Sequence, residues 1–310
     1  MKKIGIIGIG KIGSALAYEL LHQDDIQELQ IYNRDKSKQE ALLSSLKIAS
    51  HQIENNVKIK EFDFTSINNL DLVIISIKDN YDPRLSINRV SYPKWLPKNL
   101  RYSGLDLDYN LISNLINKIK EYKGIIAVIT NPVELITKYI SESIKSLNVV
   151  GLGASIDSAR ISYMLYKDQE VEIDADEILL FGEHGNKLNV VQTLSTNLCQ
   201  DGSCQRIIDT SSEIGFNIVK KIGYTLYDCI PSFLKDIKWL LSKKSTGYRS
   251  FSYFDGQYVL SQPIKKNNQI NQFEVYSKYS QSENEKLLNQ KLILNENYDM
   301  ILKELKKCSS

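Results

Sequence analysis

The chain has 310 residues, 39 of them basic and 37 acidic, which gives a formal net charge of +2 at pH 7. This length accommodates two modest domains with a substantial apolar core. The near balance of charge argues against nucleic acid or an anionic membrane as a partner, and no segment has the roughly 20 consecutive apolar residues of a membrane span.

In the first half of the chain, short apolar runs alternate with longer amphipathic stretches. The apolar runs predict strands at residues 4–9, 29–32, 57–62, 72–77 and 125–130. The stretches between them predict helices at residues 12–21, 36–50 and 105–122. Because strands that alternate with helices pair in parallel, we expect an α/β fold with a Rossmann-type, doubly wound parallel sheet.

The second half of the chain has a more mixed pattern. It predicts a helix, a short strand, one long helix, a polar β-meander and a closing amphipathic helix, at residues 157–166, 177–181, 205–243, 251–279 and 282–307. The polar stretch 265–272 is expected to be a hairpin loop. We therefore expect residues 1–146 to form a dinucleotide-binding domain and residues 147–310 to form an α+β catalytic domain.

The cysteines and the first residues indicate where the protein resides. Four cysteines in a chain of this length are too few for a disulfide framework, and they include no Cys-x-x-Cys pair that would suggest zinc: Cys199, Cys204, Cys229 and Cys308. The first apolar run enters a glycine-rich turn and lacks the cleavage site of a signal peptide. We therefore expect reduced thiols and a cytoplasmic protein.

A Gly-x-Gly-x-x-Gly motif stands between the first predicted strand and the first predicted helix. It consists of Gly8, Gly10 and Gly13, with Lys11 and Ile12 inside it. In this position the glycines allow a tight turn, close approach of the backbone to a pyrophosphate and close packing of helix on strand. The N–H groups that begin the helix would face the phosphates. We therefore expect a dinucleotide site, with a tight turn that binds nothing as the alternative.

The end of the second predicted strand bears on the choice of cofactor. An acidic residue is expected there to bind the ribose 2′-hydroxyl of NAD, but the sequence has Asn33, followed by Arg34. Asn33 removes a charge that would repel a 2′-phosphate, and Arg34, with Lys36 or Lys38, offers this phosphate a cation. NADP(H) is therefore favoured. NAD(H) is the alternative, with Arg34 as a solvated charge and Asn33 or Asp35 on the ribose.

Several spaced motifs carry a resemblance to a known family. Besides the glycine motif they are Thr-Asn-Pro-Val-Glu at 130–134, Gly-Leu-Gly-Ala-Ser-Ile-Asp-Ser-Ala-Arg at 151–160 and Gly-Glu-His-Gly at 182–185. The chain resembles the L-lactate/malate dehydrogenases, and most of all their L-2-hydroxyisocaproate dehydrogenase branch, over almost its whole length. The resemblance implies hydride transfer between NAD(P)H and a 2-oxo acid to give an L-2-hydroxy acid, in a homodimer or homotetramer.

His184 is the candidate acid–base residue. Reduction of a carbonyl leaves negative charge on its oxygen, and an imidazole can deliver a proton there near neutral pH. Of the three histidines, neither His22 nor His51 has a comparable glycine-flanked setting. The resemblance implies that Asp157 fixes the tautomer of His184 and favours its protonated form. Arg160, about one helical turn later, has the planar fork that suits the substrate carboxylate.

Two further positions come from the family. Asn131 follows a strand at the edge of the sheet where ligands bind, and the resemblance implies that it orients substrate and nicotinamide and that its bond to Pro132 is cis. Thr225 matches a position that lines the side-chain end of the pocket. The alternatives are a simple turn at Asn131 and a helix surface at Thr225.

The segment 78–100 departs from the family pattern. The family closes a loop over the substrate, with an Arg that polarises the carbonyl. Arg101 is the favoured counterpart, although the residues after it lack the family spelling, and Arg84 and Arg89 are the other candidates. The segment is long and contains three large aromatic residues, which favours a substrate larger or more apolar than pyruvate unless these side chains pack the loop onto the protein: Tyr81, Tyr92 and Trp95.

Two other functions fit parts of the pattern. One is a nucleotide-binding sensor or subunit without turnover, against which the set of Asp157, Arg160 and His184 argues. The other is a redox-assisted glycosidase with the same nucleotide fold, which would need a Cys/His metal site before the second domain. No cysteine precedes Cys199, so we expect a dehydrogenase without a metal.

Overall fold

The computed structural model describes residues 1–55, 57–79, 81–185, 187–191, 203–243, 247–267 and 272–309. Cys199 and the centre of the expected hairpin loop, residues 268–271, lie outside the described residues, as does the side chain of Cys204. Cys229 is a buried free thiol and Cys308 is an exposed one.

The first half of the chain forms the parallel part of the sheet. Its strands have the spatial order β3-β2-β1-β4-β5-β6, each parallel to its neighbours. Their bounds are β1 Lys2–Ile7, β2 Ile26–Tyr32, β3 Lys58–Glu61, β4 Leu72–Ile75, β5 Ile125–Val128 and β6 Val149–Gly151. This order is that of a doubly wound Rossmann sheet, so the predicted fold class is confirmed.

Strands of the second half extend the same sheet. β9 (Arg249–Phe254) pairs antiparallel with β6, and β10 (Val259–Asn267) pairs with β9. β10 also pairs with β7 (Leu180–Gly182) and β11 (Gln272–Val275), and β7 pairs with β8 (Leu188–Val190). In the part of the chain that the structure describes, all eleven strands belong to one sheet. The domain division at residue 146 stays a prediction, and β6, which lies beyond it, completes the parallel half.

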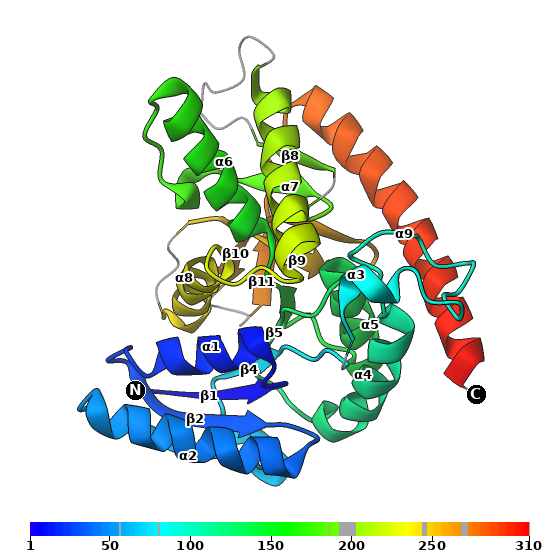
Figure 1. Cartoon of the computed structure of the whole chain (residues 1–310). Helices are drawn as coiled ribbons and strands as arrows, with labels where there is room; N and C mark the ends of the chain where they lie inside the picture. The colour runs from blue at the N-terminus through cyan, green and yellow to red at the C-terminus, as the bar shows by residue number, and fades with distance from the viewer. Residues whose placement is uncertain are drawn as a thin grey trace.

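Helices surround this sheet, and α9 runs along one side of the molecule to the C-terminus (Figure 1). The helices of the first half are α1 Lys11–Leu20, α2 Lys36–Gln52, η1 Phe64–Asn69, α3 Pro83–Ser86, α4 Leu105–Ile119 and α5 Val133–Ile144. Those of the second half are α6 Ala154–Gln169, η2 Ala175–Glu177, α7 Ser203–Ile222, α8 Cys229–Leu241 and α9 Gln281–Ser309.

Alternate side chains of the central strands enter two separate apolar cores. Ile6 of β1 and Ile74 of β4 belong to the core that α1 and α8 cover, whereas Ile7 and Ile75 belong to the core that α4, α5 and α9 cover. Burial on both faces explains why the sequence of β4 is an unbroken apolar run. A third, smaller core lies among α6, α7, β7 and β8.

The prediction of a single long helix at 205–243 is wrong. The structure has two helices, α7 and α8, joined by a turn at 223–228. Gly223, directly after α7, has φ of 92°, a left-handed conformation that ends a helix and that glycine adopts without strain. The amphipathic pattern continues through the turn, so apolar periodicity alone did not show the break.

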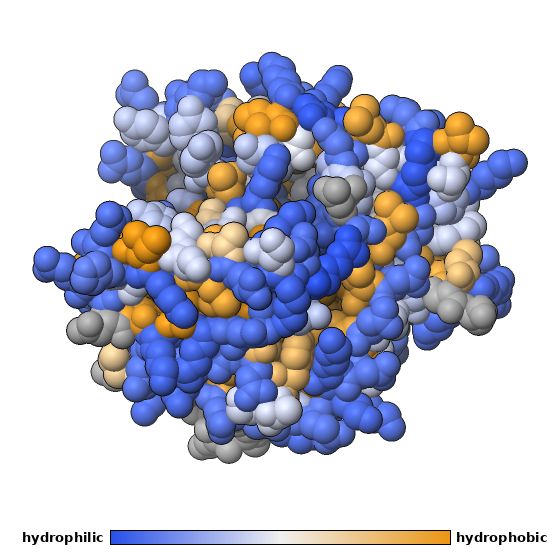
Figure 2. Space-filling model, turned by 60° about the horizontal axis from the view of Figure 1, so that its bottom comes forward, coloured by the Kyte–Doolittle hydropathy of each residue, from blue (hydrophilic) through white to orange (hydrophobic). Residues whose placement is uncertain are grey.

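The surface is mixed in character. On the face in Figure 2 hydrophilic residues predominate, and hydrophobic residues gather in smaller groups between them. No helix within the described ranges is both long and apolar enough to cross a membrane.

Candidate active site

The glycine motif lies in the turn from β1 into α1. Gly8 has φ of 99°, and a Cβ there would lie 2.3 Å from the carbonyl oxygen of Ser76. A Cβ on Gly13 would lie 2.1 Å from the carbonyl oxygen of Gly8, whereas a Cβ on Gly10 would meet nothing within 4 Å. Gly8 and Gly13 therefore permit close packing. Gly10 and the N–H groups that begin α1 leave an open cradle that fits a pyrophosphate.

The remaining residues of the motif connect it to the rest of the protein. Ile12 packs against the core beneath α1. The Lys11 ammonium lies 3.8 Å from the ring centre of Tyr224, which belongs to the turn between α7 and α8. The glycine motif and the second half of the chain therefore meet at this point.

The predicted ribose-binding residues follow β2. The side-chain oxygen of Asn33 accepts a hydrogen bond from the backbone N–H of Asp35 at 3.0 Å. Arg34, whose side chain is 53% exposed, forms an ion pair with Asp79 from the segment after β4. A 2′-phosphate that approaches Arg34 therefore meets a guanidinium that already has an anionic partner.

The two other candidate cations also have partners. Lys36 pairs with Glu61, and Lys38 lies 3.6 Å from Asp35. Asp35 caps α2 by accepting a hydrogen bond from the backbone N–H of Lys38. The positive charges at this end are therefore balanced by neighbouring carboxylates.

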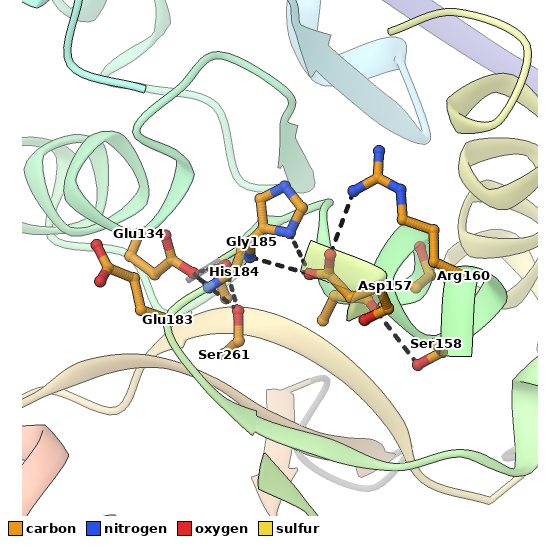
Figure 3. Close-up of polar contacts among 12 residues, drawn as sticks. Glu134, Asp157, Ser158, Arg160, Glu183, His184, Gly185 and Ser261 are labelled. Carbon is orange, nitrogen blue, oxygen red and sulfur yellow. Dashed lines mark hydrogen bonds and ion pairs between the residues drawn. The ribbon is translucent and has the colours of Figure 1, made fainter. Parts of the chain in front are cut away.

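Asp157 and His184 form the centre of the candidate site (Figure 3). Asp157 lies in the first turn of α6 and its side chain is completely buried, while His184 follows β7. Nδ1 of His184 lies 2.5 Å from Oδ2 of Asp157, and the N–H of Gly185 donates to the same oxygen at 3.1 Å. The pair fixes the orientation of the imidazole and leaves Nε2 on the side away from Asp157.

Opposing effects act on the pKa of Asp157. Its burial acts to raise this pKa, but the charge of His184, the hydrogen bond between the two side chains and the Arg160 guanidinium together hold it below its ordinary value. Asp157 therefore stays a carboxylate. A carboxylate in this position stabilises the imidazolium form of His184.

Two glycines without a predicted role make room for the site. A Cβ on Gly153, the N-cap of α6, would lie 2.8 Å from the ring of His184. A Cβ on Gly215, within α7, would lie 2.3 Å from Nη1 of Arg160. Gly153 stands in the motif that contains Asp157, which was a usable signal, whereas no motif marks Gly215.

Arg160 lies between two carboxylates. Its Nη1 is 3.4 Å from Oδ1 of Asp157, while Nη2 and Nε lie 2.6 and 3.2 Å from Oδ2 of Asp228. Burial acts to lower the pKa of Arg160, but the two carboxylates raise it above its ordinary value, so the guanidinium stays charged. Asp228 was not anticipated from the sequence, since it lies inside the stretch that we predicted as one helix.

A buried charged cluster supports the backbone of His184. Glu134 Oε1 accepts the N–H of His184 at 2.8 Å, and its Oε2 lies 2.9 Å from Nη2 of Arg101. Nη1 of Arg101 is 3.3 Å from Oε1 of Glu183. Arg101 therefore connects to His184 through Glu134, inside a cluster. Glu134 belongs to the Thr-Asn-Pro-Val-Glu motif, but no role was predicted for it. A carboxylate at the start of a helix that follows a buried strand was the signal that could have indicated one.

The two other candidate loop arginines lie elsewhere. Arg89 pairs with Asp106 in the first turn of α4. Arg84 donates from Nη1 to the backbone oxygen of Lys221 at 3.1 Å, and its guanidinium carbon lies 3.2 Å from where a Cβ of Gly223 would be. Of the three candidates, Arg84 reaches the turn between α7 and α8.

Asn131 and Thr225 are the two residues to which the resemblance assigned further roles. Asn131 is exposed at the carboxyl end of β5, and its bond to Pro132 is cis, as the resemblance implied. Thr225 is partly buried in the turn between α7 and α8, and its hydroxyl accepts a hydrogen bond from the Cys229 thiol at 3.0 Å. Thr225 therefore lies in a turn and not on a helix surface.

The aromatic residues of the segment 78–100 pack onto the protein. Tyr92 and Trp95 are partly buried against the core beneath α4 and α5. The ring of Tyr81 lies 2.4 Å from where a Cβ of Gly104 would be, and its hydroxyl donates to Asp108 at 2.7 Å. These contacts match the alternative that the rings anchor the loop, so the rings alone do not indicate a large substrate.

The arrangement combines a hydrogen-bonded imidazole, a protonated guanidinium and an open phosphate cradle. Within the residues described, no group of three or more His, Cys, Asp or Glu is placed to hold a metal ion. The groups present suit proton transfer to an anionic substrate beside a dinucleotide.

Several known proteins are similar in sequence to the chain. Residues 3–84 match the family model described as NADP oxidoreductase coenzyme F420-dependent. L-lactate dehydrogenase of Staphylococcus epidermidis is 23% identical over 273 residues, which cover 83% of this chain and 82% of that protein. L-lactate dehydrogenase 2 of Staphylococcus aureus (strain JH9) is 21% identical over 83% of this chain and 81% of that protein.

Solved structures share the fold over nearly the whole chain. A lactate dehydrogenase from a Medee basin deep-sea metagenome library has a TM-score of 0.78 at 20% identity and covers 96% of this chain and 98% of its own. The malate dehydrogenase of Archaeoglobus fulgidus, solved in complex with NADH, has a TM-score of 0.74 at 21% identity, with the same coverage. In sequence the chain is therefore similar to L-lactate dehydrogenases, and it shares its fold with lactate and malate dehydrogenases.

Proposed function

We propose that the chain is a member of the L-lactate/malate dehydrogenase family that interconverts a 2-oxo acid and an L-2-hydroxy acid with a nicotinamide cofactor. The observation that carries the proposal is the contact of 2.5 Å between Asp157 and His184 beside the guanidinium of Arg160. It brings a proton donor and a carboxylate-binding cation together. The glycine cradle of α1 supplies the place for the pyrophosphate.

The residues of the chain account for the steps around the hydride transfer. A nicotinamide cofactor held at the glycine cradle of α1 would supply the hydride, or accept it in the reverse direction. Nε2 of His184 delivers a proton to the carbonyl oxygen as negative charge develops there, and Asp157 stabilises the imidazolium before this transfer. Arg160 binds the substrate carboxylate, and Asn131 orients the substrate from the carboxyl end of β5.

Arg101 is our proposal for the group that polarises the carbonyl. It is supported by its connection through Glu134 to the backbone of His184. Two glutamates hold its guanidinium, so it would act from within a cluster and not from a freely moving loop. Arg84 and Arg89 are the alternatives.

We propose NADP(H) as the preferred cofactor. Support comes from Asn33 in place of an acidic residue, from Arg34 after it, and from the matching family model, which is described as an NADP oxidoreductase. The carboxylate of Asp79 opposes this choice, because a 2′-phosphate must take Arg34 from it. NAD(H) is therefore the alternative to test.

We also propose a substrate with a side chain larger than that of pyruvate, as in the L-2-hydroxyisocaproate branch. The support is the length of the segment between β4 and α4, residues 76–104. The aromatic residues of this segment give no further support, since they pack onto the protein.

A panel of substrates tests the function. The purified full chain is given NADPH or NADH with pyruvate, 2-oxobutanoate or 2-oxo-4-methylpentanoate, and the loss of reduced nicotinamide is followed by absorbance. We expect turnover, with a larger kcat/KM for the branched substrate. Absence of turnover with every substrate, alongside measurable binding of the reduced cofactor, would instead favour a nucleotide-binding sensor.

A further inference from the structure

Asp228 accepts hydrogen bonds from the guanidinium of Arg160, the group that the proposed function assigns to the substrate carboxylate. Its Oδ2 lies 2.6 Å from Nη2 and 3.2 Å from Nε of Arg160. A substrate carboxylate that binds Arg160 with two hydrogen bonds needs an edge of the same planar group. Gly215 packs so closely that a Cβ there would lie 2.3 Å from Nη1. The substrate and Asp228 therefore compete for a guanidinium that has little other free surface.

The backbone position of Asp228 does not explain where its side chain goes. Asp228 is the N-cap of α8, a position where aspartate usually accepts a hydrogen bond from a backbone N–H of the helix. Its side chain makes no such bond and turns to Arg160 instead. It is 27% exposed, whereas the side chain of Asp157 is completely buried. Of the two carboxylates on Arg160, Asp228 is therefore the one with room to leave.

The charges around Arg160 limit which substrates fit. Arg160 already faces the carboxylates of Asp157 and Asp228. A bound 2-oxo acid adds a third negative charge, which a protonated His184 balances. A second carboxylate on the substrate would add a fourth negative charge. It would lie at the side-chain end of the pocket, which the resemblance assigns to Thr225. This end belongs to the same turn as Asp228, and like charges that lie close together repel each other.

We propose that Asp228 is a specificity-determining residue, which yields Arg160 to the substrate carboxylate and then excludes 2-oxo acids that carry a second carboxylate. This inference rests on the proposed function, because it takes Arg160 as the carboxylate-binding group. It assigns the chain to substrates with an uncharged or cationic side chain.

The variant Asp228→Asn tests the inference, since it keeps the shape of the side chain and removes its charge. Asp209→Asn, on the exposed face of α7, is the matched control that removes one negative charge elsewhere in the same half. Steady-state kinetics are measured with 2-oxo-4-methylpentanoate and with oxaloacetate. Binding of oxamate, an unreactive analogue of a 2-oxo acid, to the protein loaded with reduced cofactor is measured by fluorescence.

The expected result is a difference between the two substrates. Asp228→Asn should lower the KM for 2-oxo-4-methylpentanoate and the Kd of oxamate roughly tenfold, with kcat little changed. It should raise kcat/KM for oxaloacetate roughly a hundredfold, since the repulsion is relieved as well. Asp209→Asn should change neither. A higher KM and weaker oxamate binding in Asp228→Asn would overturn the inference, because Asp228 would then hold Arg160 in its binding position.

Further measurements distinguish failure of this inference from an unfolded variant and from failure of the proposed function. Equal changes for the two substrates would overturn the selection by charge. Cofactor affinity and thermal unfolding report whether Asp228→Asn is folded, and Asp228→Ser replaces it if it is not. If the wild-type protein turns over no 2-oxo acid, the proposed function fails. The oxamate titration then still shows whether Asp228 competes with a carboxylate for Arg160.

Discussion

The proposed proton-transfer end and the proposed ribose end of the candidate site hold their charged groups in different ways. Asp157 is completely buried and contacts His184, Gly185 and Arg160. Arg34 at the ribose end is 53% exposed and forms its ion pair with Asp79, which is itself 28% exposed. One end is enclosed by the protein, and the other faces solvent.

This difference determines how much free energy each end loses when a charged partner is removed. A buried charge that loses its partner costs several kcal/mol, whereas an exposed ion pair contributes about 1 kcal/mol or less and is screened by salt. Asp157 and His184 therefore keep one arrangement that the fold imposes. The ribose end can exchange Asp79 for a phosphate at small cost. Substitutions should show this difference as effects that decrease from the buried end to the exposed one.

The largest effect is expected for His184→Asn. Loss of the imidazole removes the proton donor, so kcat for reduction of a 2-oxo acid should fall about a thousandfold. Binding of NADPH, measured by fluorescence, should remain nearly unchanged, because the glycine cradle lies on another element. The exposed His22 provides the control variant His22→Asn, which should keep full activity. If His184→Asn retains activity, the acid–base role belongs to another residue.

An intermediate effect is expected for Glu134→Gln. Glu134 is completely buried and neutralises Arg101, so the variant should lower the free energy of unfolding by about 3 kcal/mol, the cost of breaking a buried ion pair. Denaturation in urea measures this loss. Glu304→Gln, which removes the surface partner of Lys307, should change stability by less than about 1 kcal/mol. Equal losses in the two variants would show that the cluster around His184 contributes no more to the free energy of unfolding than a surface ion pair does.

The smallest effect is expected at the ribose end. Arg34→Ala should raise the KM for NADPH about fivefold and leave that for NADH unchanged, because the lost contact is exposed and concerns only the 2′-phosphate. Asp79→Asn should act in the opposite direction and lower the KM for NADPH, because it frees Arg34. The two cofactors are compared in steady-state kinetics at constant salt. An unchanged NADPH preference in Arg34→Ala would remove Arg34 from the phosphate site.

The parallel sheet could be predicted from the sequence because its strands are buried on both faces. Such strands are unbroken apolar runs, as in β4 (Leu72–Ile75), and the glycine motif marks the first turn between strand and helix. The break between α7 and α8 escaped prediction because it depends on the left-handed φ of Gly223. Helix α5 and strand β6, which follow the Asn131–Pro132 turn, were not predicted either.

The sequence by itself determined the chemical groups of the candidate site. Motif spacing placed Asp157 and Arg160 one turn apart on a helix and His184 after a strand, because such arrangements follow from local geometry. The tertiary structure decided what surrounds these groups. Asp228, Glu134 and Gly215 reach the site from elements distant in the chain, and Arg101 enters a buried cluster. No local pattern specifies such contacts, because they depend on how separate helices and strands pack.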